Sequence, residues 1–79
     1  MMAIVPDSNF SVSYGSFIRN GRHAKNLSQT EVAKHLNISQ AYYSALELGI
    51  RNIDLSLAMK ICSFLDLDLG DFIKSYDLR

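Results

Sequence analysis

The chain has 79 residues, of which 48% are hydrophobic and 20% charged, and it carries no net charge. This composition predicts one small globular domain rather than a disordered chain. A single cysteine, Cys62, excludes an intrachain disulfide and a cysteine-based metal site, and we expect it to be a small buried hydrophobe.

The first residues lack the basic start of a signal peptide, and no segment approaches the roughly 18 apolar residues of a membrane span. We therefore expect a soluble cytoplasmic protein. Residues 1–11 are predicted to form an N-terminal arm, because Pro6 and the polar run after it delay any helix. A first helix is expected over residues 12–25. Gly21 lies inside it and predicts close packing of another backbone.

The segment "LSQTEVAKHLN" predicts a second helix with defined ends. Ser28 and Glu31 have the spacing of a capping box, and Leu27 and Val32 that of a hydrophobic staple. Asn37 follows the last apolar residue, and asparagine adopts the left-handed conformation that ends a helix more readily than most residues. The second helix is therefore expected to end there.

A third helix is predicted over about residues 39–48, with Ser39 as its N-cap and Gly49 at its end. Asp54 or Ser56 is predicted to cap a fourth helix, about residues 54–66, and Asp68 a fifth, about residues 69–77. Five short helices with short links predict a compact all-α domain over residues 12–79.

The second and third helices have the features of a helix-turn-helix. Ala33 is small enough for a close helix crossing, Asn37 allows the tight turn, and Tyr43 and Leu46 can hold the third helix against the core. The outward side of the third helix then carries short or uncharged side chains: Gln40, Ala41, Ser44, Ala45 and Leu48.

The charges are unevenly distributed along the chain. Residues 14–53 hold five basic and two acidic residues, whereas residues 54–79 hold three basic and five acidic ones. One face could therefore meet an anionic partner despite the zero net charge.

The stretch "IRNGRHAKNLSQTEVAKHLNISQAYYSALELGIRN" resembles the lambda-repressor-like, XRE-type family of DNA-binding regulators. The similarity covers roughly residues 14–73. The matching positions are Ile18, Arg19, Arg22, Leu27, Ser28, Gln29, Val32, Ala33, Glu47 and Gly49.

The resemblance implies that the third helix enters the major groove of double-stranded DNA. The positions implied to read base edges are Gln40, Ala41 and Ser44. The positions implied to contact the sugar-phosphate backbone are Gln29, Tyr42, Arg51 and Asn52. Arg22 and Glu47 match a family ion pair between the first and third helices, and we expect it here.

Some positions depart from the family pattern. Ala45, Leu48 and Ile50 stand where charged residues are common, which weakens non-specific attraction to phosphates. Leu48 and Ile50 instead offer apolar surface to a partner. Gly21 replaces a common leucine, so the packing of the first helix on the fourth is not predicted.

Family members read palindromic sites as dimers, and we expect a homodimer here. The last two helices carry more apolar residues than one inward face needs: Phe64, Leu67, Leu69, Phe72, Ile73 and Tyr76. Two interpretations remain open. These residues form a twofold interface, which we favour, or they fill the core of the monomer.

Residues 51–69, Arg51–Asn52 followed by "IDLSLAMKICSFLDLDL", resemble small stand-alone controllers of restriction–modification operons, although phage repressors and antitoxin subunits are similar too. A sequence-specific DNA-binding regulator is the favoured function. The alternative is a protein-interaction module, such as an antitoxin-like subunit, that reuses the fold. The spacing suggests no Ser, His and acid arrangement and no phosphate-binding glycine loop. We therefore expect no enzyme activity, cofactor, metal, membrane contact or small-molecule substrate.

Overall fold

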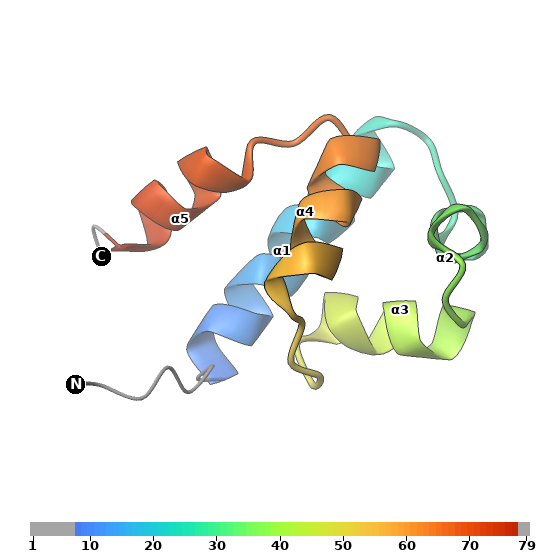
Figure 1. The fold of residues 1–79 in the computed structure, drawn as a ribbon, viewed down its shortest axis with the longest axis horizontal. Helices are drawn as coiled ribbons and strands as arrows, with labels where there is room; N and C mark the ends of the chain where they lie inside the picture. Colours follow the sequence, from blue (N-terminus) through green and yellow to red (C-terminus); the bar gives the residue numbers. More distant parts are fainter. Residues whose placement is uncertain (1–7, 78–79) are drawn as a thin grey trace.

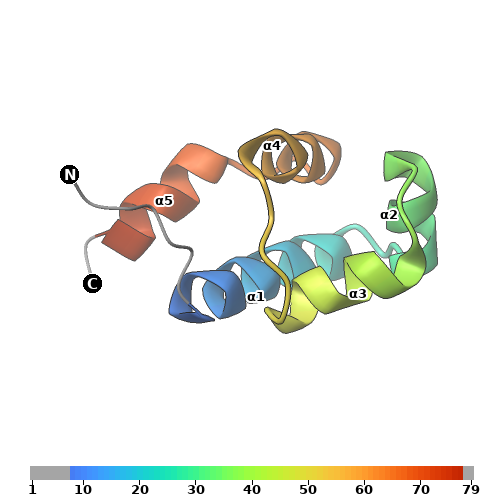
Figure 2. The ribbon, with the colours of Figure 1, turned by 60° about the horizontal axis from the view of Figure 1, so that its bottom comes forward.

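A computed structural model describes residues 8–77, and within them every regular element is an α-helix (Figure 1). The helices are α1 (Ser8–Ala24), α2 (Gln29–Leu36), α3 (Gln40–Leu48), α4 (Leu55–Phe64) and α5 (Leu69–Asp77). The all-α prediction is confirmed. In Figures 1 and 2, α1 runs along the centre, α2 and α3 lie at one end of the molecule, and α5 lies at the other.

The helix ends follow the local signals in the sequence. The Ser28 hydroxyl accepts a hydrogen bond from the Glu31 amide at 3.0 Å, and the Glu31 carboxylate accepts one from the Ser28 amide at 2.8 Å, so the predicted capping box is confirmed. Asn37 and Gly49 adopt the left-handed conformation, with φ of 59° and 77°, and end α2 and α3 as predicted.

Side chains also cap the three later helices. Ser39 accepts from the Tyr42 amide and Asp68 from the Asp71 amide, as expected. Of the two candidates for α4, the cap is Asp54, whose carboxylate accepts from the Leu57 amide at 2.7 Å.

The first helix begins earlier than predicted. It starts at Ser8, so residues 8–11 of the predicted arm are helical, and residues 1–7 lie outside the described part of the chain. Phe10 and Tyr14 explain the extension, because these aromatic rings, one turn apart, pack against Phe72 of α5. Tertiary packing thus outweighs the weak local signal at this end of α1.

The close backbone approach expected at Gly21 occurs at Gly15 instead. A Cβ at Gly15 would lie 2.3 Å from the carbonyl oxygen of Glu47, so α1 and α3 cross here with their backbones in contact. A Cβ at Gly21 would meet the side chain of Leu67, the nearest atom at 2.6 Å. The prediction for Gly21 was therefore wrong: its close neighbour is the side chain of Leu67 and not another backbone.

The core lies where α1, α2, α3 and α4 meet. Its buried apolar members are Tyr14, Ile18, Val32, Ala33, Tyr43, Leu46, Ala58, Ile61, Cys62 and Leu65. Cys62 is 3% exposed, as predicted for a small hydrophobe, and burial raises the pKa of its thiol. Within residues 8–77, no cluster of His, Cys, Asp and Glu has the arrangement of a metal site, and no helix is long and apolar enough to cross a membrane.

Candidate nucleic-acid interface

The turn between α2 and α3 fixes the direction of α3. The amide of Ile38 donates to the carbonyl oxygen of Ala33 at 3.0 Å, which closes the end of α2. Ala33 is 3% exposed, and Tyr43 and Leu46 are buried, so one side of α3 is held in the core. The opposite side is left at the surface.

The outward side of α3 carries the residues expected to read bases. Gln40 and Ala41 are exposed and Ser44 is half-buried, all within the first half of the helix. Figure 2 shows α3 along one edge of the molecule with its N-terminal end beside α2. Helix N-termini favour anions, because their first amide groups have no partner within the helix.

Arg22 of α1 and Glu47 of α3 form the ion pair expected between these helices. Arg22 Nε donates to Glu47 Oε2 at 2.6 Å and Nη2 donates to Oε1 at 2.9 Å. The side chains are only 10% and 3% exposed. Arg22 Nη1 also donates to the carbonyl oxygen of Leu27 at 2.9 Å, so the guanidinium ties α1 to α3 and to the link that precedes α2.

Two glutamines extend this pair to the surface. Gln29 Nε2 donates to Glu47 Oε1 at 2.9 Å, and Gln40 Nε2 donates to Gln29 Oε1 at 3.1 Å. Gln29 and Gln40 are the first residues of α2 and α3, so the bond places the two helix N-termini side by side.

The carboxyl group of Glu47 is held in its charged form. Burial opposes ionisation, but the hydrogen bonds from Arg22 and Gln29 outweigh it and keep the pKa of Glu47 below its ordinary value. The hydrogen bonds that Arg22 donates to Glu47 raise the pKa of the Arg22 guanidinium. Both partners are therefore charged across the physiological range.

The hydroxyl of Tyr43 lies buried beside this pair. It has no hydrogen-bond partner within the standard distance and angle limits among the described residues. Burial and the neighbouring Glu47 carboxylate raise the pKa of Tyr43, so the phenol stays protonated. Tyr43 thus acts as a core aromatic residue rather than as a surface contact.

The residues expected to contact the DNA backbone flank α3. The Arg51 guanidinium lies over the Tyr42 ring, 5.2 Å from its centroid, which orients a long cationic side chain at the surface. Asn52 is exposed, and its side-chain oxygen lies 3.5 Å from the Ser11 hydroxyl of α1. Arg51 and Asn52 therefore both have partners that restrict their positions.

The residues expected to form a dimer interface divide between core and surface. Phe72 packs on Phe10, Tyr14 and Phe17 of α1, and Leu67 covers Gly21. Ile73 is 43% exposed, whereas the other five are half-buried: Phe64, Leu67, Leu69, Phe72 and Tyr76. Larger exposed fractions occur elsewhere, including 64% at Leu48 and 71% at Ile50.

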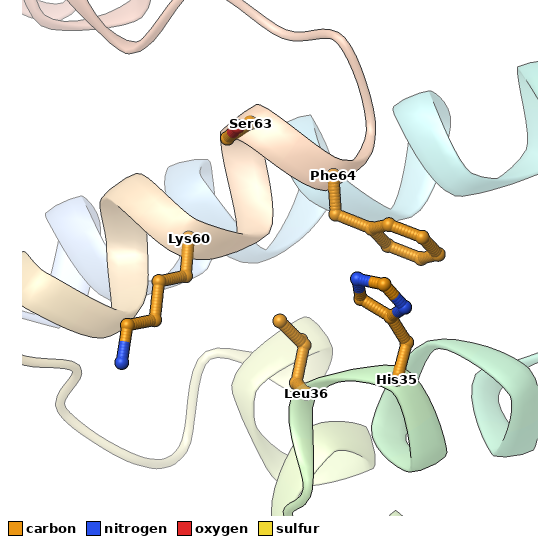
Figure 3. A pocket seen from close by; sticks show the side chains of 5 residues that line it. All are labelled: His35, Leu36, Lys60, Ser63 and Phe64. Atoms are coloured by element: carbon orange, nitrogen blue, oxygen red, sulfur yellow. The ribbon is translucent and has the colours of Figure 1, made fainter.

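A shallow hollow lies between the end of α2 and α4, and no residue of α3 lines it (Figure 3). It has a volume of about 360 Å³ and is lined by His35, Leu36, Lys60, Ser63 and Phe64. The imidazole of His35 stacks on the Phe64 ring, with 3.8 Å between centroids, which occupies one face of each ring. None of the residues expected to contact DNA lines it.

The contacts of the site that were not predicted from the sequence include the Gln29–Glu47 bond, the Gln29–Gln40 bond and the Arg51–Tyr42 stack. The signal in the sequence is that both glutamines are the first residues of helices joined by a tight turn, which places them close together.

The sequence model of the helix-turn-helix family matches residues 18–72. The chain belongs to this family. It is a helix-turn-helix DNA-binding regulator of the XRE, lambda-repressor-like type, a family of regulators rather than of enzymes. A search of curated proteins finds no match to the chain. The matched range includes both helices of the motif and all seven residues expected to contact DNA.

Proposed function

We propose that this helix-turn-helix protein binds a palindromic operator as a homodimer, with α3 in the major groove of each half-site. The observation that carries the proposal is the bond between Gln29 and Gln40, which sets the N-termini of α2 and α3 side by side at the surface. Two helix N-termini on one surface suit a phosphate and the adjacent groove.

In this proposal Gln40, Ala41 and Ser44 contact base edges. A glutamine amide can make two hydrogen bonds to adenine, and an alanine methyl can contact the methyl group of thymine. Gln29, Tyr42, Arg51 and Asn52 contact the backbone and fix the register of α3 on the duplex.

The twofold contact is proposed for α5 and the end of α4. Ile73 is the most exposed apolar residue there, and the half-buried neighbours keep surface that a second copy would cover. Since α5 lies at the end of the molecule opposite α2 (Figure 1), this contact leaves the surface of α2 and α3 accessible to DNA. Sedimentation of the wild type and of Ile73→Lys measures the oligomeric state and tests this contact. The variant should contain a larger fraction of monomer than the wild type.

The main experiment is selection of bound duplexes from random DNA at about 0.15 M salt. The proposal requires an enriched palindrome whose half-site centres lie about 34–36 Å apart, or a multiple of it, along the duplex. Gln40→Ala should relax the preference at one position per half-site by about 1–3 kcal/mol. Asn20→Ala, which removes an exposed side-chain amide from α1, serves as a matched control.

The resemblance to known controllers and the exposed apolar residues also suggest a cellular role. The resemblance at residues 51–69 favours an operon controller, of the restriction–modification kind, acting in the cytoplasm. The exposed Leu48 and Ile50 favour a second candidate, a module that acts mainly through a protein partner. Absence of any enriched sequence in the selection would support this second candidate.

A further inference from the structure

We infer that the hollow between the end of α2 and α4 binds a small aromatic monocarboxylic acid, whose carboxylate Lys60 holds and whose ring packs on Leu36 and Phe64. The inference does not depend on the proposed operator. None of the residues expected to contact DNA lines the hollow, so such a ligand can be bound together with DNA rather than in its place.

The hollow has an apolar floor and a polar rim. Leu36 and Phe64 are half-buried, whereas His35, Lys60 and Ser63 are exposed. Figure 3 shows Leu36 between Lys60 on one side and the stacked rings of His35 and Phe64 on the other. The volume of about 360 Å³ is near the lower end of the range for ligand sites, about 300–1,000 Å³, which favours a small ligand.

The rim carries a positive charge without a counterion. Within the described residues, the Lys60 ammonium group has no hydrogen-bond or ion-pair partner, and neither has the Ser63 hydroxyl. None of the lining residues is acidic. Asp66 follows Phe64 by two positions, but its carboxylate is paired with Lys25. An anion in the hollow therefore meets an unpaired cation and no lining carboxylate that would repel it.

The donors on the rim match one carboxylate group. The Lys60 ammonium and the Ser63 hydroxyl can both donate, and the imidazole of His35 adds a ring N–H. A carboxylate offers two oxygens that accept several such bonds, and its single charge is balanced by one ammonium group. A phosphate carries a second negative charge near neutral pH, for which the lining offers no second lysine or arginine.

The apolar part of the hollow favours an aromatic ring on this acid. The imidazole of His35 and the ring of Phe64 are 3.8 Å apart between centroids and inclined by 12°, so one face of each is already covered. Their edges remain, and aromatic rings pack well against the edges of other rings. The stack also holds both walls in place before a ligand arrives, which lowers the cost of ordering them on binding.

The first test uses sodium benzoate as the probe, with the DNA-free protein and a constant ionic strength. Backbone amide shifts, followed by NMR during the titration, should change saturably at the residues that line the hollow. Benzamide has the same ring without the charge, and acetate has the charge without the ring. Both should bind at least about tenfold more weakly, since a charge-assisted bond or the apolar contact is lost. Equal affinity for benzamide, or shifts spread over the whole surface, would overturn the inference.

The second test removes the charge from the rim. Lys60→Met keeps an unbranched side chain on α4 and should weaken benzoate binding at least about tenfold. Lys34→Met is the matched control, because Lys34 is an exposed lysine next to His35 in the chain but does not line the hollow. It should bind benzoate as the wild type does. Unchanged binding in Lys60→Met, or an equal loss in both variants, would overturn the inference, the second result by showing attraction to the overall charge alone.

Discussion

Gly15 of α1 lies directly against the backbone of Glu47 of α3: a Cβ at Gly15 would come within 2.3 Å of the Glu47 carbonyl oxygen and 2.7 Å of that of Leu46. Backbone atoms cannot move aside as the end of a side chain can. Gly15 therefore sets how closely α3, which carries Gln40, approaches α1.

Gly15→Ala should destabilise the fold, by about 1–3 kcal/mol or more, because the added methyl group forces α1 and α3 apart. Gly21→Ala is the matched control, since its methyl group meets the movable Leu67 side chain and gains about 1 kcal/mol of helix propensity. Urea unfolding of both variants measures the difference. A loss in Gly15→Ala no larger than in Gly21→Ala would contradict this account of the crossing.

The comparison of Gly15 with Gly21 shows what sequence can and cannot predict. Caps and turns depend on neighbouring residues, so the Ser28–Glu31 capping box and the Asn37 turn were predicted correctly. The role of a glycine depends on which helix crosses it, and Gly15 and Glu47 are far apart in the chain. The hydrogen bond from Gln29 to Glu47 could not be predicted for the same reason, because it joins residues 18 positions apart.

The Arg22–Glu47 pair predicts an acid-sensitive stability. Because the folded pKa of Glu47 is lowered from its ordinary 4.5, its contribution is fully present above that pH and is lost as the pH falls through the folded pKa. Urea midpoints between pH 3 and 7 should therefore decline below about pH 4.5. A wild-type midpoint that does not decline would contradict the lowered pKa.

Glu47→Gln should be less stable at neutral pH, because it leaves the Arg22 charge buried without a counterion. Loss of one partner of a buried pair costs about 3–5 kcal/mol. This variant should also show a flatter decline in acid. Glu31→Gln, at the exposed capping box, is the control for general carboxyl protonation and should keep most of the wild-type pH dependence.

Tyr43→Phe should leave the free energy of unfolding unchanged or raise it. The hydroxyl is buried without a partner among the described residues, and an unsatisfied buried polar group costs about 1–3 kcal/mol. Thermal unfolding of the variant provides the measurement. A loss above about 1 kcal/mol would mean that the hydroxyl makes a net favourable hydrogen bond, with Glu47 or Arg22 as the partner.

Arg51→Ala should weaken binding to all DNA sequences alike and reduce the slope of log affinity against log salt by about one, because one phosphate contact is lost. Tyr42→Leu removes the ring beneath the guanidinium but keeps its charge. It should therefore lower affinity less and leave the slope nearly unchanged. Lys60→Ala, in the hollow that no residue expected to contact DNA lines, is the control for a simple loss of positive charge. Titrations of the selected operator at several salt concentrations measure the slope for each variant. A slope for Arg51→Ala equal to that of the wild type would show that Arg51 makes no backbone contact.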